Sequence, residues 1–349
     1  MKRIAIFCDG TWNTPDESKD GKPCQTNVAK MASALLQTSI DGTAQLLYYD
    51  TGIGSEGYLL KRVYDGATGS GITENILQAY RYIIAHYEPG DELFFFGFSR
   101  GAFTVRSLSG LIRNSGILKK ENAEQAARAL KIYRSRKAGL QPRAIEATLF
   151  RKTFAVEEST PIKFIGVWDT VGSLGNPLWL KSFLSRKNQF HDTGLSSKVD
   201  FAYHALAVDE KRKNFEATLW HQNPAATGQV LEQVWFPGVH SDVGGGYPDS
   251  GLSDISLQWM IEKAEKCELN FGAIECNPDP LAVKHESYTG FYTLQKKLFR
   301  PIGLVGTDEG NTNESVHPSV IKRYKTDSNY RPKNLDDYLT SHPELLKSS

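Results

Sequence analysis

The chain has 349 residues and a nearly balanced charge, with 41 Lys and Arg against 40 Asp and Glu. This length allows one large α/β domain around a single core. The balance excludes an overall field of one sign that would draw the chain onto nucleic acid or anionic lipid. The four cysteines are too few and too scattered for a disulfide framework or a zinc motif, so we expect reduced structural thiols.

The first residues do not resemble a targeting segment. The apolar run in MKRIAIFCDG breaks at Asp9, which makes it shorter than the apolar region of a signal peptide. No stretch approaches the roughly 20 apolar residues that a membrane-spanning helix needs. We therefore expect a protein that is cytoplasmic as synthesised, with no signal peptide and no transmembrane span.

Short apolar runs alternate with helical patterns along most of the chain. The runs are RIAIFCD, AQLLYYD, ELFFFGF, IKFIGVWD and VLEQVWFPG. Most of them carry or closely precede a polar residue at their C-terminal end, which is typical of buried parallel strands. Residues 73–87 and 252–267 show helical patterns, and EPGD punctuates the turn after the first of them. This order predicts an α/β fold with a mainly parallel central sheet flanked by helices.

Three segments depart from this alternation within an expected single domain of residues 1–349. Residues 114–160, rich in Ala, Lys, Arg and Glu, predict an exposed helical insertion. Residues 175–198 mix Trp179 and other large apolar side chains with cations, which favours either a cap over the site or an ordinary connection packed on the core. Residues 277–349 are polar and punctuated by proline, and we predict only a C-terminal extension there.

The stretch GDELFFFGFSRGAF runs from an aromatic strand directly into a helix and contains the pentapeptide G-x-S-x-G. Gly97 and Gly101 let the backbone turn tightly enough to hold Ser99 in a strained conformation, with its hydroxyl above the sheet. The N–H of Arg100, at the start of the helix, then becomes an oxyanion donor. A chance Gly-Ser-Gly loop is the alternative, but the flanking strand and helix favour a nucleophile elbow.

A nucleophilic serine needs a histidine base and an orienting carboxylate from elsewhere in the chain. Asp169 ends the apolar strand in FIGVWDTVGS, and His240 follows the strand in VWFPGVHSDVGGGY. Active-site residues of open α/β sheets collect at such strand ends. The order Ser99, Asp169, His240 is that of an α/β-hydrolase, so we expect these residues to form a catalytic triad.

Other residues compete for the roles of base and acid. His317, in VHPSV, is a second candidate for the base, while Asp242 and Asp254 are rival acids. Asp242 also suits the orientation of the glycine-rich loop that follows it, and Asp254 suits a helix N-cap. A structural role is the default for any lone histidine. Three further histidines lack a comparable position at a strand end, namely His204, His221 and His285.

The loop FCDGTWN follows the first apolar run, where such enzymes carry a second oxyanion donor. Gly10 permits a close backbone approach, so the N–H of Gly10 or Thr11 is the expected donor. The carboxylate of Asp9 would oppose an oxyanion, and we expect it to turn away and tie down the loop beside Asn13 or His240. A plain turn at the end of a strand is the alternative.

Three other chemistries fit the sequence less well. GIGSEG, residues 52–57, matches G-x-G-x-x-G after a strand, but glycines interrupt the helix that a dinucleotide site needs. FCDGT resembles the start of aspartate-nucleophile phosphatases, except that Phe7 occupies the place of the first aspartate. Possible metal ligands follow no compact spacing, so we expect no metal and no cofactor. These ligands are Asp9, Asp169, His240 and Asp242.

Six ordered blocks carry a resemblance to a known family. They are IAIFCDGTWN, YDTGIG, GSGITENI, GFSRGAF, GVWDTVG and FPGVHSDVGGGY. Together they resemble the α/β-hydrolase family that includes the type VI secretion phospholipase effectors of the first lipase class. The resemblance runs from about residue 3 to residue 260, and HPSV extends it. It implies a serine esterase or phospholipase without a redox cofactor, which acts on acyl ester bonds of glycerophospholipids through Ser99.

The resemblance also implies partners. Effectors of this family often carry membrane-anchoring regions, and because this chain has no obvious large one, we expect no more than peripheral membrane contact. Secretion by a type VI system, and a partner for secretion or immunity, follow from the resemblance alone. No nucleic-acid partner is expected. The alternatives are an esterase for small soluble esters and a catalytically inactive binding module with the same fold.

Overall fold

The centre of the molecule is a seven-stranded sheet in the order β4-β1-β5-β6-β7-β8-β9, in which every neighbouring pair is parallel. The predicted mainly parallel sheet is therefore confirmed. The computed structural model describes residues 1–10, 18–19, 21–51, 70–171, 194–303 and 311–347. The strands of the large sheet are β1 (Arg3–Cys8), β4 (Gln45–Asp50), β5 (Glu92–Phe98), β6 (Ile162–Trp168), β7 (Val199–Ala207), β8 (Val230–Phe236) and β9 (Glu314–Val316). A separate antiparallel pair consists of β2 (Ser18–Lys19) and β3 (Lys22–Pro23).

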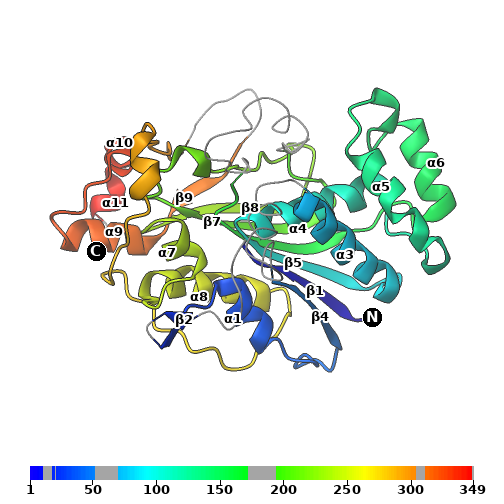
Figure 1. The fold of residues 1–349 in the computed structure, drawn as a ribbon, viewed down its shortest axis with the longest axis horizontal. Coiled ribbons are helices and arrows are strands. Elements are labelled where there is room, and N and C mark those ends of the chain that lie inside the picture. The colour runs from blue at the N-terminus through cyan, green and yellow to red at the C-terminus, as the bar shows by residue number, and fades with distance from the viewer. Residues whose placement is uncertain (11–17, 20, 52–69, 172–193, 304–310, 348–349) are drawn as a thin grey trace.

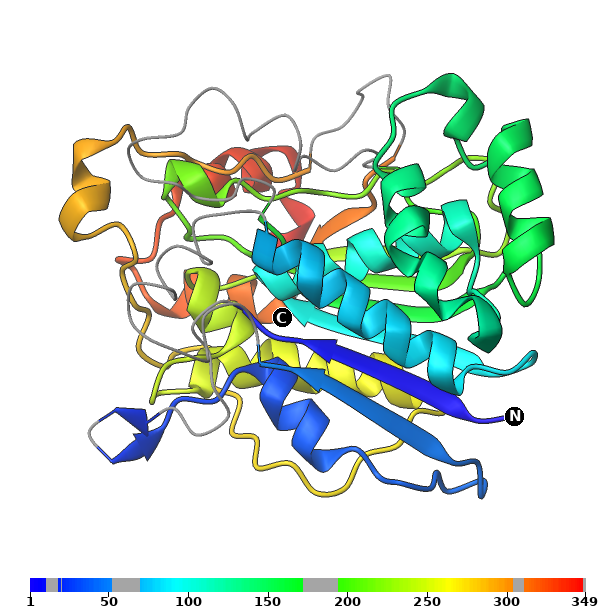
Figure 2. The same cartoon turned by 45° about the vertical axis from the view of Figure 1, so that its right-hand side comes forward.

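Helices cover both faces of the sheet, as Figure 1 and Figure 2 show. One face packs against α3 (Ser70–His86) and α4 (Arg100–Ser115), and the other packs against α1 (Asn27–Ala34) and α8 (Gly251–Glu265). The helices α3 and α8 correspond to the two predicted helical patterns. The other described α-helices are α5 (Ala126–Tyr133), α6 (Ile145–Phe154), α7 (His240–Gly244), α9 (Pro318–Thr326), α10 (Lys333–Ser341) and α11 (Glu344–Lys347). Short 3-10 turns occupy η1 (Lys120–Gln125), η2 (Ala138–Leu140), η3 (Lys213–Phe215) and η4 (Gly290–Leu294).

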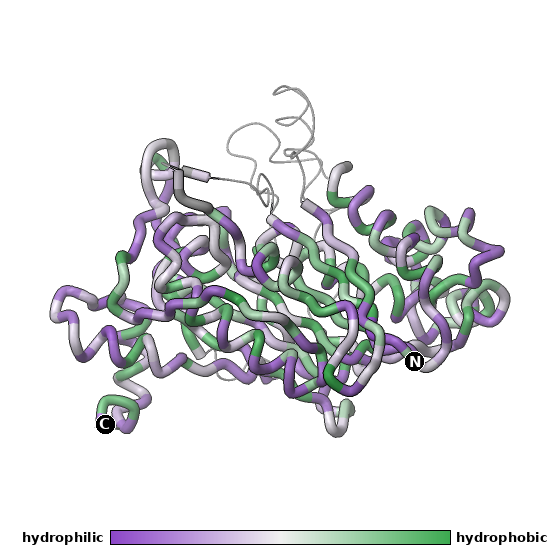
Figure 3. The backbone as a smooth tube through the Cα atoms, turned by 90° about the horizontal axis from the view of Figure 1, so that it is seen from below, coloured by the Kyte–Doolittle hydropathy of each residue, from purple (hydrophilic) through white to green (hydrophobic). Residues whose placement is uncertain are grey.

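The aromatic strand β5 divides its side chains between the two faces of the sheet. Phe95 packs in one core cluster with Tyr80 of α3, whereas Phe94 and Phe96 pack in the other with Met260 of α8. Successive side chains of a strand point to opposite faces, so a continuous aromatic run is buried completely only between two helical layers. Figure 3 accordingly shows hydrophobic segments gathered in the middle of the molecule.

Two strands of the seven-stranded sheet lie outside the five predicted runs. β7 carries the fully buried His204 in its middle, and β9 has only three residues. A buried polar residue interrupts the apolar pattern, and a strand of three residues is too short to show one. Both strands are recognised only through their pairing with β6 and β8.

The C-terminal residues pack on the same sheet as the rest of the described chain. β9 pairs with β8, while Val320 of α9 and Leu335 of α10 pack against Leu206 and Trp235. The extension predicted at residues 277–349 therefore supplies the edge strand and a helical cover for one end of the sheet. This arrangement brings the segment close to the ends of β7 and β8.

The predicted insertion contains α5 and α6. Figure 1 shows this pair at one end of the molecule, away from α7. Most of the predicted cap, residues 175–193, lies outside the described residues, and so does Trp179. The same holds for residues 52–57, which carry the G-x-G-x-x-G match.

Candidate active site

Ser99 lies in the turn between β5 and α4. Its backbone φ is 57° and its ψ is −116°, a conformation that costs a residue with a side chain roughly 1–3 kcal/mol. Its N–H donates to the Trp168 carbonyl at 3.0 Å, and its carbonyl accepts from the Phe103 N–H at 3.2 Å. The strand, turn and helix that G-x-S-x-G requires are therefore present, with a strained serine at the corner.

Gly97 and Gly101 allow three backbone segments to touch at this corner. A Cβ atom at Gly101 would lie 1.9 Å from the Cys8 carbonyl oxygen, and one at Gly97 would lie 2.6 Å from the Gly101 carbonyl carbon. Both contacts involve backbone atoms, which cannot rotate away as a flexible side chain can. The two glycines therefore let the first turn of α4 lie directly against the ends of β1 and β5.

We expect Gly101→Ala to lower the free energy of unfolding by about 3 kcal/mol, because the added methyl group forces α4 away from β1. Urea unfolding followed by circular dichroism measures this change. Gly272→Ala is a matched control, since a Cβ atom there would meet only ordinary contacts at 3.6 Å, and it should cost less than about 1 kcal/mol. Equal losses in the two variants would contradict the close packing.

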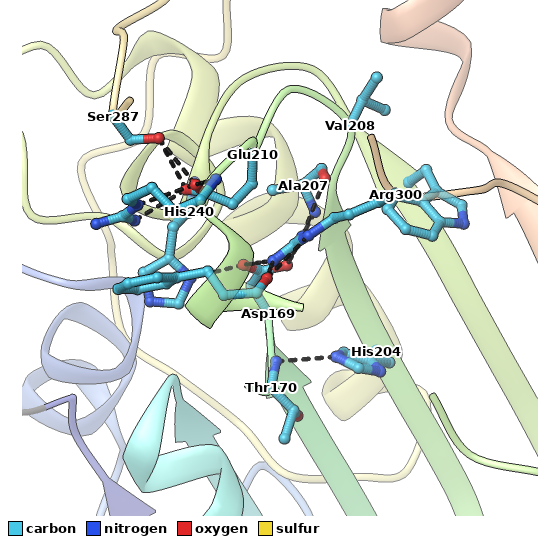
Figure 4. Close-up of polar contacts among 12 residues, drawn as sticks. Asp169, Thr170, His204, Ala207, Val208, Glu210, His240, Ser287 and Arg300 are labelled. Carbon is cyan, nitrogen blue, oxygen red and sulfur yellow. Dashed lines mark hydrogen bonds and ion pairs between the residues drawn. The ribbon is translucent and has the colours of Figure 1, made fainter. Parts of the chain in front are cut away.

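Asp169 and His240 form a buried hydrogen-bonded pair, as Figure 4 shows. Asp169 follows β6 with a φ of 41°, and His240 begins α7. The His240 Nδ1 atom lies 2.6 Å from Asp169 Oδ2, and the Asp169 side chain is fully buried. Because the carboxylate binds Nδ1–H, the Nε2 atom is the ring nitrogen that can take a proton from a nucleophile or give one to a substrate.

Arg300 binds the other side of the Asp169 carboxylate (Figure 4). Its Nη1 atom donates to Oδ1 at 2.6 Å and its Nη2 atom donates to Oδ2 at 3.0 Å, while the Ala207 N–H donates to Oδ1 at 3.1 Å. Burial by itself raises the pKa of the Asp169 carboxyl, but the Arg300 charge and the His240 bond together lower it below its ordinary value. The carboxylate is therefore ionised and held in one orientation.

The guanidinium of Arg300 is held in place by carbonyl groups. Its Nη1 atom donates to the Ala207 carbonyl at 3.0 Å, and its Nε atom donates to the Phe215 carbonyl at 3.1 Å. The Asn334 side chain of α10 donates to the Arg300 carbonyl at 3.0 Å. Sequence reasoning missed Arg300, because an arginine in a polar stretch carries no sign that it will be buried against Asp169.

The His240 ring lies against two aromatic rings. The centroid of Phe98, the last residue of β5, is 4.6 Å away, and that of Phe215 is 5.0 Å away. The His240 backbone N–H donates to Glu210 Oε2 at 3.3 Å, and this carboxylate pairs with Arg212 at 2.8 Å. Burial raises the pKa of Glu210, but the Arg212 bond and charge bring it below its ordinary value. Glu210 is a second site residue that carried no signal in the sequence.

His204 supports the backbone next to the buried pair (Figure 4). Its Nε2 atom accepts from the Thr170 N–H at 3.1 Å, and its Nδ1 atom lies 3.2 Å from Gln233 Oε1. Burial and the Arg106 charge lower the pKa of His204 to about 3. The neutral ring therefore acts as a structural acceptor for the residue that follows Asp169.

We expect His204 to make the fold less stable as the pH falls below its ordinary pKa of 6.5. In that range the unfolded chain protonates this ring, whereas the folded protein does so only near a pKa of about 3. Because the unfolded state then binds more protons, the free energy of unfolding falls by up to about 1.4 kcal/mol per pH unit.

Urea unfolding at several pH values between about 7 and 4 tests this expectation. The variant His204→Gln keeps an acceptor for the Thr170 N–H but removes the titrating ring, so its stability should depend less on pH. Equal pH slopes in the two proteins would show that the proton uptake comes from other groups.

The rival acids and the rival base have partners of their own. The Asp242 Oδ1 atom lies 2.6 Å from His285 Nδ1, and Asp254 forms an ion pair with Lys30 at 2.7 Å. His317 is the N-cap of α9 and accepts a backbone N–H of its first turn. These contacts connect the three rivals to the ends of α7, α8 and α9 rather than to the buried pair.

Asp9 follows β1, and its carboxylate makes several hydrogen bonds to described residues. Its Oδ2 atom accepts from Thr26 Oγ1 at 2.5 Å and from the Tyr49 hydroxyl at 2.8 Å. Its Oδ1 atom accepts from the Gly10 N–H at 2.6 Å. The carboxylate is buried and connects the ends of β1 and β4 to the start of α1.

The hydrogen bonds of Asp9 involve Gly10, one of the two residues expected to supply the second oxyanion donor. The N–H of Gly10 already donates to Asp9, so in this structure it is bonded within its own loop. Thr11 and Asn13 lie outside the described residues. Of the two donors predicted from the loop, Gly10 is therefore the weaker candidate.

Metal-binding and membrane-spanning features were searched among the described residues alone. There, no group of three or more His, Cys, Asp and Glu side chains could hold a metal ion. No helix of this part of the chain is both long and apolar enough to cross a membrane. The four cysteines are free thiols.

The parallel sheet, its two helical layers and the sharp turn after β5 place the protein in the α/β-hydrolase-like class. The family model described as "T6SS, Phospholipase effector Tle1-like, catalytic domain" matches residues 2–263. The chain therefore belongs to this family. The matched region includes Ser99, Asp169 and His240, whereas Arg300 lies beyond it.

Other similar proteins are longer than this chain. The uncharacterised protein YEL023C of Saccharomyces cerevisiae is 31% identical over 233 residues, which are 62% of this chain and 32% of that protein. A crystal structure of an uncharacterised protein from Pseudomonas aeruginosa is 18% identical, with a TM-score of 0.42, and the match covers 77% of this chain and 46% of that one. A structure of the Tle1 effector bound to the VgrG spike of the type VI secretion system is 20% identical, with a TM-score of 0.41, and the match covers 71% of this chain and 51% of that one. The matches thus span between about a third and a half of these relatives.

Proposed function

We propose that the protein is a serine hydrolase that cleaves carboxylic ester bonds, with Ser99 as nucleophile, His240 as base and Asp169 as the orienting acid. The strained backbone of Ser99 carries this proposal. Contacts around the three residues support it: the Ser99 N–H donates to the Trp168 carbonyl, which precedes Asp169, Asp169 binds His240, and the His240 ring packs on Phe98, which precedes Ser99.

In the proposed reaction, His240 Nε2 takes the Ser99 proton while the serine oxygen attacks the ester carbonyl. Asp169 stabilises the imidazolium that forms, and Arg300 keeps the carboxylate ionised and oriented. The Arg100 N–H, at the N-terminus of α4, stabilises the tetrahedral oxyanion, with Thr11 as the preferred second donor. His240 then protonates the leaving alcohol, and water hydrolyses the acyl-enzyme by the reverse sequence of proton transfers.

We further propose that the ester belongs to a glycerophospholipid. Membership of the Tle1-like phospholipase effector family supports this choice of substrate. Family membership also leads us to propose secretion by a type VI system and a partner for secretion or immunity. These two proposals concern the whole protein, so they need experiments other than those that test the reaction at Ser99.

Two measurements on the purified chain test the proposal. A fluorophosphonate should label Ser99, because labelling requires both an activated serine and an oxyanion site. Release of fatty acid from phospholipid should be compared with hydrolysis of short nitrophenyl esters. Activity on short esters alone would replace the phospholipid by a small soluble ester. A folded protein with neither labelling nor activity would contradict the hydrolase proposal and favour a binding module.

A further inference from the structure

The helical insertion concentrates positive charge in a chain that is otherwise acidic. Its residues 118–154, named here the basic lobe, contain ten Lys and Arg but only three Asp and Glu, a net charge of +7. The whole chain carries +1, so the remainder carries a negative charge. A lobe of this charge attracts anionic surfaces over a distance of about 8 Å at physiological salt.

Large apolar side chains of the basic lobe are exposed among these cations. Ile145 is 76% exposed and Leu149 is 57% exposed, and both lie on one face of α6 because they are four residues apart. An open groove of about 690 Å³ runs between α5 and α6 beside them. Leu149 and other apolar residues line this groove together with the cations Arg128, Lys131 and Lys137.

Few acidic groups offset the cations of the basic lobe. Lys131, Lys137 and Arg143 are exposed, and the described residues form no ion pair with them. Glu146 is the acidic residue that lines the groove. The positive charge of the basic lobe is therefore exposed to solvent and free to attract an anionic binding partner.

We propose that the basic lobe docks on a bilayer that contains anionic phospholipid. A surface that binds at a membrane interface combines cations, which reach the headgroups, with apolar side chains, which enter the boundary of the acyl region. Nucleic acid would use the cations but would gain little from exposed Ile145 and Leu149, because its affinity comes mainly from phosphate contacts. Charge complementarity and exposed aliphatic groups together thus favour the bilayer.

The docking surface is separate from the buried Asp169–His240 pair. Figure 1 and Figure 2 show α5 and α6 together at one end of the molecule. The helix α7, which begins with His240, lies away from that end. Vesicle binding by the lobe therefore does not depend on catalysis. Its consequence for catalysis, a higher local concentration of lipid ester, rests on the proposed function.

Flotation with lipid vesicles tests the docking. The full chain carries Ser99→Ala so that the vesicles stay intact, and the vesicles contain phosphatidylcholine alone or with phosphatidylglycerol. One variant adds Lys131→Glu and Lys137→Glu, and a second adds Ile145→Ser and Leu149→Ser. The matched control adds Lys266→Glu and Lys322→Glu, two exposed cations outside the lobe.

The chain should bind anionic vesicles in a salt-dependent manner and neutral vesicles weakly. The lysine variant should lose at least about tenfold in its partition coefficient, the aliphatic variant should lose several-fold, and the control should lose much less. Circular dichroism establishes that each variant is folded. Equal binding to neutral and anionic vesicles, or equal losses in lobe and control variants, would overturn the proposal. Binding of duplex DNA without vesicle binding would replace it with a nucleic-acid surface.

Activity measurements separate this proposal from the proposed function. With Ser99 restored, the lobe variants should hydrolyse dispersed short esters at the wild-type rate but should act more slowly on anionic vesicles. A protein that binds vesicles but hydrolyses no ester would contradict the proposed function and leave the docking intact. Full activity on anionic vesicles in both lobe variants would overturn the link between docking and catalysis.

Discussion

Ser99→Ala should lower kcat for ester hydrolysis by about 10⁶-fold, because it removes the nucleophile of the proposed reaction. The residual rate would come from oxyanion stabilisation and substrate binding alone. Release of nitrophenol and of fatty acid measures the loss, and labelling by a fluorophosphonate should disappear in parallel. Hydrolysis at the wild-type rate in a folded Ser99→Ala protein would refute the assignment of Ser99.

The strained backbone of Ser99 can be tested independently by measuring the free energy of unfolding of variants at this position. Alanine has the same difficulty as serine at a φ of 57°, so Ser99→Ala should unfold at nearly the same urea concentration as the wild type. Glycine adopts this conformation freely, so Ser99→Gly should gain about 1 kcal/mol in the free energy of unfolding while it loses activity. Ser109→Ala, within the helix α4 that follows this turn, is the control that should retain activity. A loss of stability in Ser99→Gly would contradict the strained turn.

Arg300→Gln should both weaken the fold and change the pH dependence of hydrolysis. Removing one partner of a buried ion pair leaves the Asp169 charge without its strongest neighbour, which costs about 3–5 kcal/mol of stability. Arg300 also lowers the pKa of the buried Asp169 carboxyl, so its loss should raise that pKa. The acid limb of kcat/KM should therefore move to higher pH, since a protonated Asp169 cannot stabilise the imidazolium that forms in the proposed reaction.

The charged groups around the buried Asp169–His240 pair determine the direction of this shift. They are the carboxylates of Asp169 and Glu210 and the guanidinium groups of Arg300 and Arg212. Burial raises the pKa of the Asp169 carboxyl, and the Arg300 charge lowers it. Removal of Arg300 takes away this cation while the burial remains, so the carboxyl should be protonated at a higher pH than in the wild type.

A conservative variant keeps this prediction testable if Arg300→Gln does not fold. Arg300→Lys retains the positive charge but loses the two parallel bonds to Asp169. Its pH profile should stay near that of the wild type, while kcat falls because the carboxylate is held less firmly. Arg331→Gln changes an exposed arginine of the same segment and serves as the control. An unchanged pH profile and rate in Arg300→Gln would show that the contact has no role in the reaction.

Much of the sheet could be predicted from local pattern. The five apolar runs correspond to β1, β4, β5, β6 and β8. Strands buried on both faces read as continuous apolar stretches, which accounts for all of these except the edge strand β4, which is only partly buried. The strand β7 was missed because His204 interrupts its apolar pattern, although that ring is satisfied by Thr170 and Gln233 once the sheet forms. Hydrogen bonds to residues distant in sequence cannot be read from a local window.

In the candidate site, too, some residues could be predicted from local pattern and others could not. Asp169 and His240 could be selected because each follows a buried strand, and parallel neighbouring strands end at the same edge of a sheet. Glu210 and Arg300 could not, because neither lies in a motif nor at the end of a predicted strand. The sequence predicts the N–H of Gly10 or Thr11 as a second oxyanion donor, and the structure shows the Gly10 N–H bonded to Asp9.

Local sequence pattern is enough to predict the layered α/β class and the sharp turn at Ser99. Both depend on interactions within a few residues: apolar runs that must be buried, and glycines that permit a turn no other residue allows. The surroundings of Asp169 could not be predicted in this way, because Arg300 lies 131 residues away along the chain. Such a contact depends on how β7, β8 and the C-terminal segment pack together. The charge state of the site is thus a property of packing that no local pattern in the sequence records.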